Sequence, residues 1–165
     1  MKNNTKAMVL AGITGALYVA LTMISTALGL SFGPIQLRFG EALTVLPFLF
    51  PCTAWGLFVG CILCNILSPY GLLDLVVGSL ATLIAAKWTA KCRKKWLAPL
   101  PPVLVNGVLC GALIAWQMVG ANAGFGAAFA MNFLSVSLGQ AIACYVLGGL
   151  LLRFLPKVKN LPFGL

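Results

Sequence analysis

Long apolar runs, separated by short polar stretches and prolines, follow one another along the whole chain. A bilayer core is about 30 Å thick, so a spanning helix needs about 20 apolar residues, and fewer when it is packed inside a bundle. Pro51 and Pro69 delimit two short segments, each of which is marginal as a lone span. The pattern predicts six membrane helices, at about 7–30, 41–50, 53–67, 71–86, 102–121 and 126–155. We therefore expect an all-α integral membrane protein, a compact bundle of six transmembrane helices that forms a single domain over residues 1–165.

The composition agrees with this pattern. Of 165 residues, 61% are hydrophobic and only 8% are charged, and the mean hydropathy is +1.05. Eleven Lys or Arg stand against two Asp or Glu, so the net charge of +9 reflects a shortage of acids. A nucleic-acid-binding protein of this charge would carry many more basic groups on a solvated face. We therefore expect no nucleic-acid partner.

Several classes of chemistry are excluded by what the sequence lacks. There is no His, which excludes imidazole metal sites and Ser-His or Cys-His nucleophile pairs. There is no G-x-x-x-x-G-K-[ST] loop, so this chain does not hydrolyse ATP in the P-loop manner. The six cysteines lie mostly in apolar runs, and the pair Cys61 and Cys64 has no second pair to complete a metal site, which favours packing. We expect no catalytic residues, no cofactor and no metal.

Basic residues collect before the first helix, after the fourth and after the sixth. These three clusters are Lys2 and Lys6; Lys87, Lys91, Arg93, Lys94 and Lys95; and Arg153, Lys157 and Lys159. Six helices place all three on one side of the membrane, which the positive-inside rule assigns to the cytoplasm, together with both termini. The cluster after the fourth helix is also compatible with a solvated patch that recruits a partner.

Arg38, Glu41 and Asp74 are left after that assignment, at or near the outward ends of the helices. Ionisable groups at membrane depth cost about 2.5 to 3.5 kcal/mol at a helix centre, so they are usually paired or functional. Two structural alternatives stay open. Arg38 and Glu41 are spaced i, i+3 and can cap the second helix as a pair, and Asp74 can favour the dipole of the fourth.

Polar side chains gather in the same outer half and outline a candidate binding pocket. Besides the two acids they are Gln36, Asn65, Trp116, Gln117, Asn122 and Asn132. Two carboxylates, several amides and an aromatic face suit a flat, nitrogen-rich ligand that can carry a positive charge. For each amide the alternative is an interhelical hydrogen bond, and for Trp116 an interfacial anchor. Asn106 and Gln140 fall in inner halves of their helices, and we assign them to packing.

Small residues form a stripe on the first helix. Gly12, Ala16 and Ala20 recur every four residues, the pattern that lets another helix approach closely. Packing within the bundle is the alternative, and we expect it for the equally spaced Gly56–Gly60 and Gly107–Gly111–Ala115.

Two segments resemble the QueT family. They are PIQLRFGEALTVLPFLFP at 34–51 and NILSPYGLLDLVVGSLATLIAA at 65–86, and the Q-x-R-x-x-E-A-L motif that begins at Gln36 is the more specific part. The resemblance covers nearly the whole chain, including PPVLVNGVLCG at the start of the fifth helix. QueT proteins are substrate-binding S components of energy-coupling factor (ECF) transporters, which are ABC importers.

The resemblance implies a subunit in the plasma membrane of a prokaryotic cell that captures a queuosine precursor, 7-aminomethyl-7-deazaguanine, from outside. The subunit would then dock, through the stripe on its first helix, onto a transmembrane coupling subunit driven by two cytoplasmic ATPases. Glu41 and Asp74 would serve the guanine edge and the aminomethyl cation, in either order, while Arg38 holds Glu41 ionised and oriented. The alternatives are an S component for another vitamin-like heterocycle and an autonomous carrier of small cations.

Overall fold

The computed structural model describes residues 2–31, 35–120 and 124–157, and every regular element among them is helical. The elements are α1 (Lys2–Ala27), η1 (Phe39–Phe48), α2 (Thr53–Asn65), α3 (Gly71–Lys91), η2 (Lys95–Leu97), α4 (Leu100–Val119), α5 (Phe125–Ala141), η3 (Ile142–Leu147), α6 (Gly148–Phe154) and η4 (Leu155–Lys157). The α5, η3 and α6 segments form one continuous helix with a π-helical middle. The predicted all-helical fold is confirmed, and each of the six predicted segments coincides with a helix.

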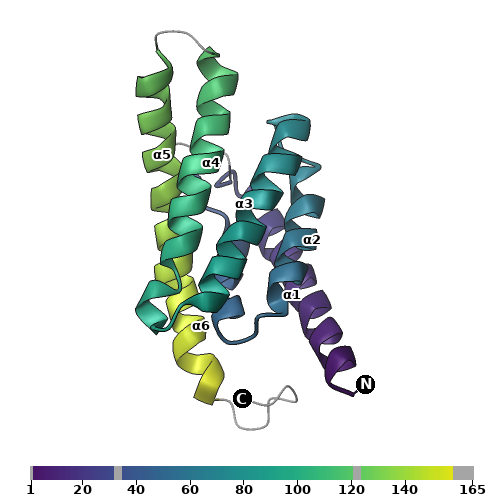
Figure 1. Cartoon of the computed structure of the whole chain (residues 1–165). Coiled ribbons are helices and arrows are strands. Elements are labelled where there is room, and N and C mark those ends of the chain that lie inside the picture. The colour runs from purple at the N-terminus through teal and green to yellow at the C-terminus, as the bar shows by residue number, and fades with distance from the viewer. Residues whose placement is uncertain (1, 32–34, 121–123, 158–165) are drawn as a thin grey trace.

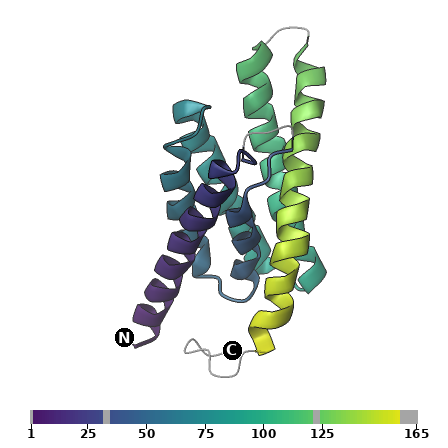
Figure 2. The same cartoon turned by 180° about the vertical axis from the view of Figure 1, so that it is seen from behind.

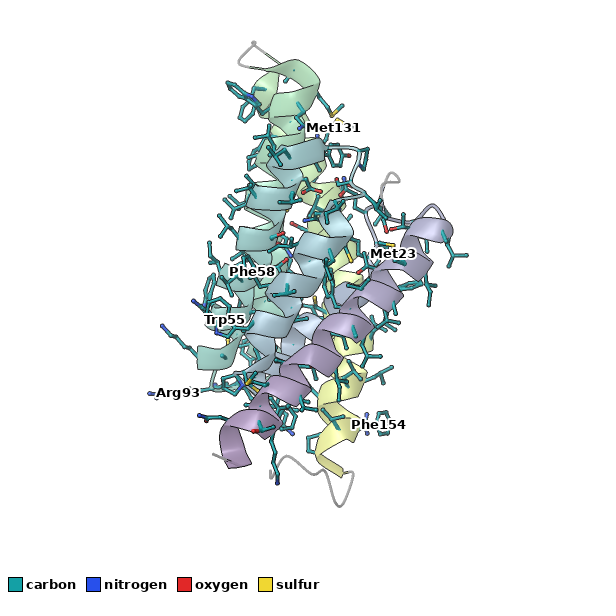
Figure 3. All side chains as sticks on the ribbon, turned by 90° about the vertical axis from the view of Figure 1, so that its right-hand side faces the viewer. Met23, Trp55, Phe58, Arg93, Met131 and Phe154 are labelled. Carbon is teal, nitrogen blue, oxygen red and sulfur yellow. The ribbon has the colours of Figure 1, made fainter. Side chains whose placement is uncertain are left out.

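The three basic segments lie at one end of the bundle. α1 begins and α6 ends at the same end, while the α4–α5 pair extends furthest in the opposite direction (Figures 1 and 2). Arg93 of the loop after α3 lies at the first end and Met131 at the second (Figure 3). We call these the basic end and the distal end. The three basic segments lie at the same end, as expected for a chain with six helices. The cytoplasmic orientation of that end stays a prediction.

Within the described ranges, four helices are long and apolar enough to cross a membrane. They are Asn4–Ala27, Gly71–Lys91, Lys95–Val119 and Phe125–Phe154. The other two predicted spans form shorter helices, of 10 residues in η1 and 13 in α2. Both fall below the roughly 20 residues that a lone spanning helix needs. By length, therefore, the structure bears out four of the six predicted spans.

The short helix η1 is enclosed by the others. All its residues from Gly40 to Pro47 are buried, and it contacts α1, α2, α3, η3 and α6. It is a 3-10 helix rather than the expected α-helix, and its length of 10 residues is unusual for this tighter form. A helix that is apolar on all sides is typical of such a buried position. Because η1 carries Glu41, its burial brings a carboxylate into the interior.

Glycines allow α1 and α2 to pack backbone to backbone. A Cβ added at Gly15 would lie 2.7 Å from the carbonyl oxygen of Gly56, and one at Gly60 would lie 2.9 Å from that of Gly15. A Cβ at Gly56 would overlap the carbonyl of Ala11. The predicted internal packing of Gly56 and Gly60 is confirmed, because no larger residue fits between these helices.

The α4–α5 contact has the same character. A Cβ at Gly107 would overlap the hydroxyl of Ser137, and one at Gly111 would lie 3.0 Å from the backbone of Phe133. Ala115 is fully buried. This second predicted internal contact is confirmed as well.

The stripe on α1 faces outwards. Gly12, Ala16 and Ala20 are exposed, and a Cβ at Gly12 would meet nothing within 4 Å. Gly12 and Ala16 help to line an apolar groove between α1 and α2, together with Trp55 and Val59. Among the described residues, this stripe therefore takes no part in the close packing of α1 against α2.

We predict that Gly56→Val destabilises the bundle, because the added side chain must displace the α1 backbone. Overpacking of this kind costs about 1–3 kcal/mol. Gly12→Val is the matched control, since it adds the same side chain to the neighbouring helix where space is open. Thermal unfolding of the purified proteins in detergent measures the difference, and equal midpoints for both variants would contradict the close approach of α1 and α2.

Candidate functional site

A polar pocket lies between η1, α2, α3, α4 and α5. Its lining residues are Gln36, Arg38, Glu41, Cys61, Tyr70, Asp74, Gly78, Thr82, Asn106, Cys110, Ile114, Val136 and Gln140. Three helices line it through residues spaced by four, which places them on one helical face: Asp74–Gly78–Thr82 on α3, Asn106–Cys110–Ile114 on α4 and Val136–Gln140 on α5. The pocket thus brings together both acidic residues of the chain.

Glu41 is delivered to the pocket by η1 and is 2% exposed. Its Oε1 accepts a hydrogen bond of 2.6 Å from the hydroxyl of Tyr18, a fully buried residue of α1. The side chain of Gln140 lies beside it. No residue in the described part of the chain makes a hydrogen bond of good geometry to Oε2, which is buried. A buried acceptor without a partner lowers the stability of the fold by about 1–3 kcal/mol. A ligand that donates a hydrogen bond to Oε2 would recover this free energy.

Asp74 is held in a network at the first turn of α3. Its Oδ2 accepts a hydrogen bond of 2.6 Å from Ser68 Oγ and lies 3.6 Å from Arg38 Nη2. Arg38 Nη1 donates to Asn65 Oδ1 at 3.2 Å, and Asn65 Nδ2 donates to the backbone oxygen of Asp74 at 3.1 Å. The loop before η1, the end of α2 and the start of α3 are tied together by this network.

We expected Arg38 to hold Glu41 ionised and oriented. Arg38 makes its ion pair with Asp74, Glu41 Oε1 accepts its hydrogen bond from Tyr18, and Arg38 and Glu41 line the same pocket. A role of Arg38 in keeping Glu41 ionised therefore stays a prediction. Asp74 is therefore an ion-pair partner and not only a residue that favours a helix dipole. With both carboxylates ionised, one guanidinium and two carboxylates would give the pocket a charge of −1.

Asn106 on α4 has no partner for its side chain. It is 2% exposed, and neither Oδ1 nor Nδ2 has a hydrogen bond within the described ranges. Buried polar groups are nearly always hydrogen-bonded, and an amide offers both donors and an acceptor. Oδ1 and Nδ2 of Asn106 therefore favour a ligand group that presents a hydrogen-bond donor and an acceptor side by side.

Asn106 and Gln140 line the pocket, although we assigned both to packing. We also gave no role to Tyr70, whose ring lines the pocket, or to Tyr18, which donates to Glu41. The four-residue spacing of Asn106 with Cys110 and Ile114, and of Val136 with Gln140, is the signal that places each amide on a shared face. Depth along the helix was the wrong criterion, since the pocket reaches from Asp74 at the first turn of α3 to Thr82, two turns further along.

Of the nine predicted binding residues, the structure brings four to the pocket wall: Gln36, Arg38, Glu41 and Asp74. Asn65 lies behind them and contacts the pocket through Arg38. The other residues lie elsewhere or outside the described ranges.

The predicted residues from the ends of α4 and α5 do not line the pocket. Trp116 is 55% exposed, and the aromatic ring on the pocket wall is that of Tyr70. Gln117 Nε2 donates to the backbone oxygen of Tyr70 at 2.8 Å and so ties α4 to the start of α3. Asn132 Nδ2 donates to the backbone oxygen of Ala128 at 2.8 Å, within α5. Asn122 lies outside the described residues.

The space between the lining side chains is small. It amounts to about 20 Å³, which is close to the room that one water molecule needs. A fused heterocycle is many times larger, so its binding requires the walls of the pocket to move apart. In the parts of the chain that the structure covers, no group of three or more His, Cys, Asp or Glu could hold a metal ion.

Comparison with known proteins identifies relatives of this chain. A family model described as QueT transporter matches residues 8–157. Over 83 residues the chain is 37% identical to the Queuosine precursor transporter QueT of Lactococcus lactis subsp. cremoris (strain MG1363), a match that covers 50% of this chain and 48% of that protein. The match thus spans about half the length of this curated relative. No solved structure matches the chain.

We predict that Arg38→Gln lowers the unfolding midpoint, because it leaves Asp74 as a buried carboxylate without its cation. Breaking a buried pair by removing one partner costs about 3–5 kcal/mol. Asp74→Asn in the same background removes the uncompensated charge, so the double variant should lose less than the sum of the two single losses. Thermal unfolding of the three variants tests this, and strictly additive losses would show that the two side chains do not stabilise each other.

Proposed function

The chain belongs to the QueT transporter family, and from this membership we propose that it is the substrate-binding subunit of an ECF-type importer. We propose further that the polar pocket captures a queuosine precursor, 7-aminomethyl-7-deazaguanine. The observation that carries the proposal is that Glu41 Oε2 and the amide of Asn106, buried on the wall of one pocket, have no hydrogen-bond partner among the described residues.

The charge of the pocket suits this ligand. With both acids ionised beside Arg38, the pocket would carry −1, and an aminomethyl ammonium group would bring the sum to zero. Burying a charge is tolerable only when it is paired, so a monocation is favoured over a neutral or anionic ligand. Asp74 already accepts from Ser68 and lies against Arg38, so Glu41 is the acid with free capacity for a new donor.

The hydrogen-bonding groups suit a guanine-like edge. Such an edge presents two adjacent N–H donors, which match a carboxylate, and next to them a carbonyl acceptor, which matches the Nδ2 of Asn106. The ring of Tyr70 is available to contact the face of the heterocycle. Several convergent polar groups in an otherwise apolar bundle are typical of a specific small-molecule site.

The segment at 35–38, before η1, is the wall that we propose to move. A Cβ at Gly139 would overlap the backbone oxygen of Gln36, so this segment is packed onto α5. At its other end Arg38 pairs with Asp74 on α3. The segment thus lies across the pocket from α5 to α3 outside any regular helix, and its displacement would create the space that a ligand needs.

For delivery, we propose that Gly12, Ala16 and Ala20 form the surface that docks on a transmembrane coupling subunit, with two cytoplasmic ATPases supplying the energy. The support is that the stripe is exposed and borders an apolar groove. Without a P-loop motif of its own, this chain would act as the receptor of the complex and carry out no reaction.

We predict that the purified chain binds 7-aminomethyl-7-deazaguanine without any nucleotide present, and that Asn106→Ala weakens this binding. Removing one partner of a buried hydrogen bond leaves the other unsatisfied and costs about 1–3 kcal/mol, or about 5- to 150-fold in affinity. Asn132→Ala is the matched control, the same substitution outside the pocket lining, and should change affinity by no more than about twofold. Isothermal titration calorimetry measures all three proteins.

Two outcomes of this titration would count against the proposal. If the wild type binds no 7-deazapurine at all, the substrate assignment fails. If Asn106→Ala and Asn132→Ala behave alike while the wild type binds, the ligand sits outside this pocket.

We predict that Ala16→Trp leaves ligand affinity intact but stops uptake by the complete transporter, because the bulky ring blocks close approach of another helix. Ala130→Trp, at an exposed position of α5, is the matched control and should transport normally. Uptake of labelled precursor in cells or liposomes, together with a binding titration, separates the two effects. A parallel loss of binding in Ala16→Trp would instead mean that the stripe serves internal packing.

A further inference from the structure

A second groove lies at the basic end, between the start of α4 and the α5–η3–α6 helix. Its walls include Lys95, Trp96, Tyr145, Gly149, Leu152 and Arg153. We propose that this groove binds an anionic phospholipid, with the phosphodiester held by Lys95 and Arg153 and one acyl chain lying along Gly149 and Tyr145.

The two cations have no acidic side chain to pair with. The chain contains two acids in all, Glu41 and Asp74, and both line the polar pocket. Lys95 and Arg153 are exposed and line one groove from opposite sides. A lysine and an arginine that converge on one place are the usual ligands of a phosphate group. Charge complementarity therefore selects an anion as the occupant.

The position of the groove selects a lipid as the source of that anion. Lys95 begins one apolar span, Lys95–Val119, and Arg153 is the residue before the end of another, Phe125–Phe154. Both cations thus lie where apolar helices end, at the level of lipid headgroups, and Trp96, which is 64% exposed, is typical of this interface. Basic pockets between membrane helices attract anionic headgroups.

The shape of the groove fits an acyl chain. Tyr145, Gly149 and Arg153 are spaced by four and share one helical face over about 12 Å. A Cβ at Gly149 would meet nothing within 4 Å, whereas one at Gly148 would lie 2.9 Å from the Ala42 carbonyl and the Val45 side chain. Gly148 is therefore required for packing on η1, while Gly149 leaves an open notch that leads from the cations towards the apolar layer.

Native mass spectrometry of the full chain in detergent tests the proposal. The protein is titrated with phosphatidylglycerol and with phosphatidylcholine of the same acyl chains, and we expect it to prefer phosphatidylglycerol. Lys95→Gln with Arg153→Gln should weaken phosphatidylglycerol binding about tenfold or more, and Gly149→Leu should weaken it by filling the notch. The matched controls are Lys91→Gln with Arg93→Gln, which removes two exposed charges at the end of α3 and just after it, and Gly126→Leu, which fills open space at the other end of the α5–η3–α6 helix.

Several results would overturn the proposal. One is equal binding of both lipids by the wild type, and another is an equal loss in the Lys91 and Arg93 control, which would indicate diffuse attraction only. Glycerophosphoglycerol, which lacks acyl chains, should bind far more weakly than the lipid; if it binds as well and Gly149→Leu has no effect, the groove is a site for soluble phosphates. If the Lys95 and Arg153 variant keeps its lipid but no longer assembles with a coupling subunit, the groove is a protein contact.

Discussion

An ionised side chain inside an apolar bundle must find its partners within the protein, and this constraint governs how the elements around the pocket are arranged. Arg38 and Asp74 lie on different elements, and their pairing fixes the loop before η1 against the start of α3. Ser68 donates to Asp74 and Asn65 accepts from Arg38, and these hydrogen bonds join the end of α2 to the ion pair. One small polar network thus fixes the loop before η1, the end of α2 and the start of α3 relative to one another.

The buried helix η1 follows from the same constraint. A carboxylate on a lipid-facing helix would be exposed to hydrocarbon, but Glu41 sits on a helix that the other helices enclose, where the hydroxyl of Tyr18 reaches it. Enclosure also explains why η1 is apolar apart from Glu41 and Thr44, whose hydroxyl donates to the backbone oxygen of Glu41.

The order and approximate limits of the helices could be predicted from the sequence because apolar runs and prolines mark them clearly, and the close glycine contacts could be predicted from their spacing. The faces of the helices could not, because membrane helices lack the contrast between polar and apolar sides that orients a helix in a soluble protein. Trp116 and Asn132 therefore seemed equivalent to Glu41 by depth, yet they lie outside the pocket, while Asn106 lies on its wall. The 3-10 form of η1 depends on its neighbours, which no local pattern reveals.

The small volume of the pocket has a kinetic consequence. If the ligand can enter only when the segment at 35–38 has moved away, the observed affinity equals the intrinsic affinity multiplied by the fraction of molecules that are open. The association rate constant then depends on how often this segment opens, and it is lower than the rate constant for diffusional encounter of ligand and protein. If this segment moves as proposed, two relatives with identical pocket walls could differ in affinity through the packing of Gln36 on Gly139 alone, since a tighter contact would lower the population of the open form.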